Sequence, residues 1–195
     1  PLRAEAPLTV FAAASLKNAL DDVVADWDAP VVVSYAGSGA VARQVALGAP
    51  ADVIVLANAD WMAWLEDRDL LQVQAEVLSN TLVVIGPVGS PAMVAAKDLP
   101  LRLSDGELSG GRLAVGQTQS VPAGMYARTW LQGQGLWSEL AGRLAETENV
   151  RAALALGRRR PGGQHGGVRM TIRHVPPVEA AVCHGLTYAC LREGR

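Results

Sequence analysis

The chain has 195 residues, of which 50% are apolar and 18% charged, so it can bury a sizeable core and global disorder is excluded. The net charge of −2, from 17 basic and 19 acidic residues, offers no strongly basic surface, and we expect no nucleic-acid partner. No apolar run approaches the roughly 18 residues that a membrane-spanning helix requires.

Strands and helices are predicted to alternate along the first 156 residues. Apolar runs predict strands at 8–13, 31–35, 51–57, 78–87 and 112–116, and a short extended segment at 144–146. Apolar positions spaced three and four apart predict helices at 16–27, 41–47, 61–65, 123–131 and 150–156. The segment 89–111 is polar and is predicted to be irregular. This alternation is typical of an α/β fold with a largely parallel sheet.

Four of the predicted strands lead through a turn of small or polar residues into the start of a helix. The residues that we single out at these turns are Ser15, Ser38, Ala123 and Val150. A helix N-terminus leaves backbone N–H groups without partners and carries a partial positive charge, so it suits an anion. Taken singly, Ser15 is expected to be an N-cap, Ser38 a turn residue and Val150 a core residue. The repetition is what favours a binding site.

The four turns contain no Lys or Arg, so their donors are N–H and O–H groups alone. Such a set suits a small, fully ionised, tetrahedral oxyanion. The segment Gly37-Ser38-Gly39 has neither the Lys of a phosphate-binding loop nor the flanking glycines of a hydrolase nucleophile elbow. An enzyme acting on a phosphorylated or carboxylated substrate stays an alternative, although the turns supply no general acid or base.

The composition changes at Gly157. All three histidines, at 165, 174 and 184, and both cysteines, at 183 and 190, lie beyond it. Only a short strand near 168–173 and a short helix near 178–191 are predicted there. The Arg-, Gly- and Pro-rich composition is typical of a GC-rich gene read out of frame, and we hypothesise a frameshift. At the other end, Ala4-Glu5-Ala6 has the form of a signal-peptidase site, which would indicate an exported protein, and an ordinary frayed terminus is an equal alternative.

Several motifs together resemble the periplasmic molybdate-binding proteins of ABC importers. The motifs are VFAAASL at 10–16, Ser38 before VARQ at 41–44, GAPADV at 48–53, GRLAVG at 111–116 and VPAGMYA at 121–127. The resemblance covers residues 8–156. It implies a two-lobed periplasmic-binding-protein fold of type II that closes around molybdate or tungstate and delivers it to a membrane permease. It further implies a periplasmic monomer with no catalysis and no cofactor besides the anion.

The resemblance also implies the ligands. Ser15 and Ser38 would each bind the molybdenum oxyanion through the hydroxyl and the N–H, and Ala123 and Val150 through the N–H alone. Family members continue with a strand of the type Gly-Ile-Val-Tyr, whose tyrosine also binds the anion. The present chain has no match for that strand, and Tyr188 does not stand in its context. The C-terminal part of the fold is therefore expected to be incomplete.

The expected organisation is a first lobe at 1–83, a second lobe at 84–156 and a divergent tail at 157–195 that is disordered or frameshifted. Two alternatives remain besides the enzyme. One is a binding protein for another tetrahedral oxyanion such as sulfate. The other is a non-functional truncated product.

Overall fold

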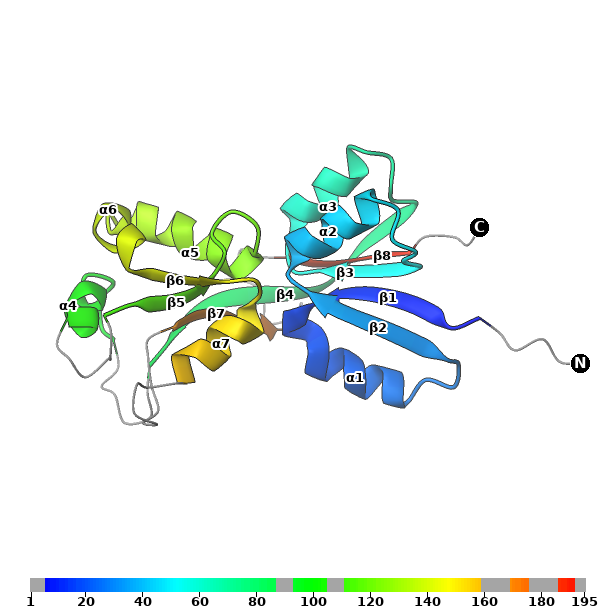
Figure 1. Ribbon diagram of the computed structural model, residues 1–195, viewed down its shortest axis with the longest axis horizontal. Coiled ribbons are helices and arrows are strands. Elements are labelled where there is room, and N and C mark those ends of the chain that lie inside the picture. The colour runs from blue at the N-terminus through cyan, green and yellow to red at the C-terminus, as the bar shows by residue number, and fades with distance from the viewer. Residues whose placement is uncertain (1–5, 87–92, 105–110, 159–168, 176–185, 192–195) are drawn as a thin grey trace, which may run out of the picture. The chain divides into compact units, whose positions relative to one another are not determined.

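The computed structural model describes residues 6–86, 93–104, 111–158, 169–175 and 186–191 (Figure 1). The chain divides into two compact units. The first consists of Pro1–Thr81 and His174–Arg195, and the second is Leu82–Arg173. The boundary falls within strand β4 (Val73–Ile85), which therefore contributes residues to both units. The predicted lobe boundary between residues 83 and 84 lies in the same strand.

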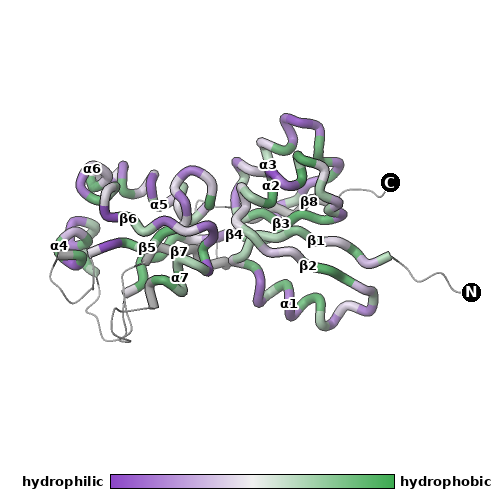
Figure 2. The backbone as a smooth tube through the Cα atoms, viewed as in Figure 1, coloured by the Kyte–Doolittle hydropathy of each residue, from purple (hydrophilic) through white to green (hydrophobic). Residues whose placement is uncertain are grey.

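The first unit contains a mixed sheet with the strand order β2-β1-β3-β8-β4. Its strands other than β4 are β1 (Leu8–Ala13), β2 (Val31–Ala36), β3 (Val53–Leu56) and β8 (Leu186–Leu191). Strand β1 runs parallel to both β2 and β3, whereas β8 runs antiparallel to β3 and β4. Figure 2 shows β3 as a continuous apolar segment, as expected for a strand covered on both faces.

Helices connect the parallel strands of the first unit. They are the 3₁₀ turn η1 (Ala14–Leu16), α1 (Lys17–Ala25), α2 (Ser38–Ala46) and α3 (Ala59–Glu66). The core lies where α2 and α3 pack on the sheet, and it contains Val41, Ala42, Val45, Ala51, Ile54, Leu56, Met62 and Leu65. Helix α1 contributes less than its apolar stripe predicts, because Val23 and Trp27 are 56% and 58% exposed.

The second unit has the strand order β4-β7-β5-β6. Strand β5 (Leu113–Gly116) runs parallel to β6 (Leu144–Thr147) and to β7 (Arg169–Val175). The helices are α4 (Asp98–Ser104), α5 (Pro122–Gly133), α6 (Trp137–Leu140), the 3₁₀ turn η2 (Ala141–Arg143) and α7 (Val150–Arg158). The core is formed by Leu99, Leu103, Leu113, Val115, Ala127, Leu131, Leu140 and Leu144. In the described part of the chain, no helix is both long and apolar enough to cross a membrane.

The predicted α/β class is confirmed, and the differences are local. The segment expected to be irregular contains α4, whose Leu99 and Leu103 are buried one helical turn apart. The strand expected near 168–173 is confirmed as β7. The helix predicted near 178–191 is wrong for residues 186–191, because these residues form strand β8. This strand is hydrogen-bonded to β3 on one side and to β4 on the other. Residues 178–185 of that prediction, and 4–5 of the signal-peptidase motif, lie outside the described residues.

Candidate functional site

Ser15 lies in the first turn of the helical segment that follows β1. Ala13 has a non-helical backbone (φ −59°, ψ 133°) and is the N-cap of η1, which continues directly into α1. The prediction that Ser15 is the N-cap is therefore wrong, because the small Ala13-Ala14 pair lets the chain turn two residues earlier. Ser15 is half-buried and lies in the first turn of the segment, at the positive end of its dipole.

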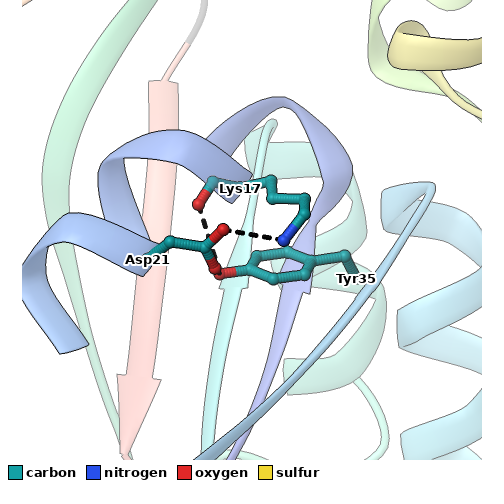
Figure 3. Close-up of polar contacts among 3 residues, drawn as sticks. All are labelled: Lys17, Asp21 and Tyr35. Carbon is teal, nitrogen blue, oxygen red and sulfur yellow. Dashed lines mark hydrogen bonds and ion pairs between the residues drawn. The ribbon is translucent and has the colours of Figure 1, made fainter. Parts of the chain in front are cut away.

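A polar cluster ties the start of α1 to the end of β2 (Figure 3). The Tyr35 hydroxyl donates to Asp21 Oδ1 at 2.7 Å, and Lys17 Nζ lies 2.7 Å from Asp21 Oδ2 and 4.8 Å above the Tyr35 ring. Burial raises the pKa of the Tyr35 hydroxyl, and the hydrogen bond and charge of Asp21 raise it further. The cation that follows Ser15 by two residues is thus paired with Asp21.

Ser38 is the first residue of α2, three residues before the predicted start. Gly37 is the N-cap, with an extended backbone, and its carbonyl accepts from the N–H groups of Ala40 and Val41 at 2.9 and 3.0 Å. The Ser38 side chain is only 1% exposed, and its Oγ accepts a hydrogen bond from the Ala57 N–H at 3.0 Å. Since that bond uses a lone pair, the Ser38 hydroxyl proton is left to donate elsewhere.

The sheet register brings Ser15 and Ser38 to the same edge of the first unit. Ala13 of β1 is paired with Ala36 of β2, and the two strands are parallel. Each serine follows its paired alanine by two residues. Two helix starts and two hydroxyls therefore stand next to each other at the carboxyl end of the sheet, where ligands of such folds bind.

Ala123 lies in the first turn of α5 in the second unit. Val121 is the N-cap and Pro122 the first helical residue, a position that suits proline because an N–H there has no helical partner. The Met125 N–H already donates to Val121 O at 2.9 Å. The backbone donors at the start of this helix are thus those of Ala123 and Gly124, and both residues are buried.

Val150 is the first residue of α7, and Asn149 caps it. Asn149 Oδ1 accepts a hydrogen bond from the Ala152 N–H at 2.9 Å, which is the bond that an N-cap side chain makes to the first turn of a helix. The Thr147 hydroxyl fixes the preceding turn, since its Oγ1 lies 3.1 Å from Val115 O and 2.9 Å from Asn149 O. Thr147 is paired with Gly116 in the parallel β5–β6 register, so the turns that lead to α5 and α7 leave the same edge of this sheet.

The structure thus places the predicted site residues as two pairs. Ser15 and Ser38 lie at one sheet edge of the first unit, and Ala123 and Val150 follow strands at one sheet edge of the second. Each pair combines helix N-termini without a Lys or Arg in the turn, an arrangement that can bind an oxyanion through N–H and O–H donors. Among the described residues, no three His, Cys, Asp or Glu side chains form a group that could hold a metal ion.

The sequence interpretation missed Asn80 of β4, which is hydrogen-bonded to Ala57, the residue that in turn donates to Ser38. Its side chain is 1% exposed and its Nδ2 donates to Ala57 O at 2.8 Å. The available signal was the run of polar residues from Ser79 to Thr81 directly before the apolar end of the strand. Buried amides in a strand need partners, which points to a contact with another polar group.

Comparison with known proteins places these features in a family. The family described as bacterial extracellular solute-binding proteins matches residues 8–167. The molybdate-binding protein ModA of Escherichia coli is 41% identical over 158 residues, which are 78% of this chain and 61% of that protein. ModA of Haemophilus influenzae is 40% identical over 160 residues, 78% of this chain and 62% of that protein. The chain therefore spans less than two thirds of the length of these curated relatives.

Among solved structures, the periplasmic molybdate-binding protein of Azotobacter vinelandii superimposes with a TM-score of 0.73. The match covers 96% of this chain and 86% of that one, at 19% sequence identity. The likeness confirms the predicted periplasmic-binding-protein fold.

Proposed function

The chain belongs to the bacterial extracellular solute-binding proteins, and we propose that it binds molybdate or tungstate for delivery to the membrane permease of an ABC importer. The proposal is supported by the pairing of helix N-termini at the sheet edge of each unit, with donors but no cation in the turns. The two curated relatives, at 41% and 40% identity, are molybdate-binding proteins. We propose that the protein acts in the periplasm as a monomer, without catalysis and without a cofactor besides the anion.

The proposed ligands are the hydroxyl and N–H groups of Ser15 and Ser38 and the N–H groups of Ala123 and Val150. Each helix N-terminus carries roughly half a positive charge, so these donors favour an anion without the desolvation cost of a buried Lys or Arg. The N–H groups of this set can only donate, and they favour a fully ionised tetrahedral dianion. A protonated oxyanion such as hydrogen phosphate would find no acceptor for its own O–H group among these N–H groups.

Calorimetric titration with molybdate, tungstate, sulfate and phosphate tests the proposal. Molybdate and tungstate should bind with similar affinity, because the two anions have the same charge and nearly the same size. Sulfate should bind more weakly because it is a smaller dianion, and hydrogen phosphate because it is protonated. Preferential binding of sulfate would overturn the molybdate assignment in favour of another oxyanion.

Thermal unfolding provides an independent measurement. A ligand that binds the native state raises the melting temperature by mass action, so molybdate should raise it in a concentration-dependent manner. A melting curve that does not respond to any of the four anions would favour the non-functional alternative.

A further inference from the structure

Two hydrogen bonds connect the buried residues Ser38, Ala57 and Asn80. The Ala57 N–H donates to Ser38 Oγ at 3.0 Å, and the carbonyl of the same residue accepts from Asn80 Nδ2 at 2.8 Å. Ser38 and Asn80 are each 1% exposed, and Ala57 is 2% exposed. Water therefore does not compete for these bonds, and both of them restrain Ala57.

These bonds control where the Ser38 hydroxyl can donate. A hydroxyl has one proton and two lone pairs, and the Ala57 N–H occupies one lone pair. The proton is thereby directed away from Ala57. The N–H and the carbonyl of Ala57 belong to neighbouring peptide planes that meet at its Cα atom. The hydrogen bond from Asn80 holds the second of these planes and so restrains the position of Ala57, whose N–H contacts Ser38. The amide assignment is secure because a carbonyl only accepts, so nitrogen must face it.

Asn80 is an unusual residue for its position. It follows Ser79, which is paired with Leu186 at the start of β8, so the Asn80 side chain reaches Ala57 beyond the β4–β8 pairing. Its Oδ1 is buried and has no hydrogen-bond partner among the described residues. An unpaired buried acceptor is costly, and an apolar residue of the same shape would avoid that cost. The amide is therefore explained by the bond that its Nδ2 donates.

We propose that Asn80 is a positioning residue for anion binding, which orients the Ser38 hydroxyl toward the oxyanion through Ala57. The inference rests on the proposed function and adds to it a residue that does not itself touch the anion. Asn80 also stands two residues before the boundary between the units, which lies between Thr81 and Leu82. The strand that continues into the second unit is thus hydrogen-bonded to the residue that holds Ser38.

The test uses Asn80→Leu, because leucine has the same branched shape and no donor. The dissociation constant for molybdate should rise about tenfold, the effect expected when one hydrogen bond to a charged group is weakened. In the Ser38→Ala background, Asn80→Leu should cause no further loss, because the hydroxyl that it orients is absent. The same fold loss in both backgrounds would show a merely structural role and overturn the proposal.

Leu65→Ala serves as the matched control for stability. Leu65 is fully buried in α3 of the same unit and takes no part in these two hydrogen bonds, so its truncation destabilises the unit through a cavity. Below its melting temperature this variant should keep the wild-type dissociation constant. A tenfold loss in Leu65→Ala as well would mean that lowered stability alone explains the Asn80→Leu result, which overturns the proposal.

The amide resonance of Ala57 gives a measurement on the wild-type protein that does not depend on any variant folding. Saturation with molybdate should shift the Ala57 amide proton, because its acceptor Ser38 Oγ becomes the donor to the anion. Binding without such a shift would overturn the role of Asn80 and leave the proposed function intact. Absence of molybdate binding to the wild-type protein would overturn both.

Discussion

Substitution of Gly124 by alanine should displace the start of α5 and with it the Ala123 N–H. A Cβ atom at Gly124 would lie 2.0 Å from Gly116 O and 2.5 Å from Gln117 O. Ordinary contact begins at 3.4 Å, so the helix start would have to move by up to 1.4 Å. The atoms in the way belong to the backbone at the end of β5, and no side-chain rotation relieves the contact.

The size of this displacement sets the expected losses. Overpacking of this kind costs about 1–3 kcal/mol of stability. A binding group must be held within about 0.5 Å of its productive position, and the shift exceeds that tolerance. We therefore expect Gly124→Ala to lower the melting temperature by several degrees and to raise the dissociation constant for molybdate by about tenfold or more, or ~1.4 kcal/mol. Differential scanning calorimetry and calorimetric titration measure the two effects.

Gly133→Ala is the matched control at the other end of the same helix. A Cβ atom at Gly133 would meet nothing within 4 Å. This variant should be more stable than the wild type by about 0.4–1 kcal/mol, because alanine reduces the entropy of the unfolded chain, and it should bind molybdate with unchanged affinity. Wild-type stability and affinity in Gly124→Ala would refute the argument from close packing.

Three further substitutions test separate contacts. Ser38→Ala removes the acceptor of the buried Ala57 N–H and should lower the free energy of unfolding by about 1–3 kcal/mol. It should also weaken molybdate binding, and an unchanged dissociation constant in calorimetric titration would contradict the assignment of Ser38 as a ligand. Asn149→Ala removes the cap of α7 and should lower the free energy of unfolding by about 1 kcal/mol. A melting temperature equal to that of the wild type would contradict this expectation. Burial raises the pKa of Tyr35, so the native state resists ionisation of this residue and stability should fall as pH rises above about 10. Tyr35→Phe should lessen that alkaline loss, and parallel stability profiles for the two proteins would exclude the effect.

The parallel strands were predictable because their signal is local. The apolar runs that became β1, β3 and β5 each end in small or polar residues, and a helix follows after a short turn in each case. Continuous rather than alternating apolar character indicates burial on both faces, which is what a parallel sheet with helical crossovers requires. Neither β8 nor its antiparallel pairing could be predicted in this way, since both depend on open edges at β3 and β4.

Helical periodicity was less informative where the outcome depends on other segments. The apolar spacing predicts a helix at 16–27, but α1 ends at Ala25, and both Val23 on the helix and Trp27 beyond it are exposed in the described structure. Periodicity shows which residues share a face and cannot show what covers it. Helix α4 was missed for the opposite reason. It has seven residues and contains Pro100, so only the pair Leu99 and Leu103 signals its buried side.

Site residues that act through side chains and those that act through the backbone differ in how far the sequence reveals them. Ser38 is visible as a hydroxyl, although its burial and its bond to Ala57 depend on a strand 15 residues further on. Asn80 could not be assigned at all, since its role exists only once β4 lies within reach of Ala57.

Ala123 and Val150 carry no chemical signal of their own, because a backbone donor is the same in every residue except proline. Their positions are nevertheless encoded by their neighbours. Pro122 can occupy only the first turn of α5, and the Asn149 side chain fixes the first turn of α7. The donors that a helix leaves without partners are determined by where it begins, and a shift of one residue changes them. The residues that define such a site in the sequence are therefore the proline, the cap and the close-packed Gly124, rather than the residues proposed to touch the anion.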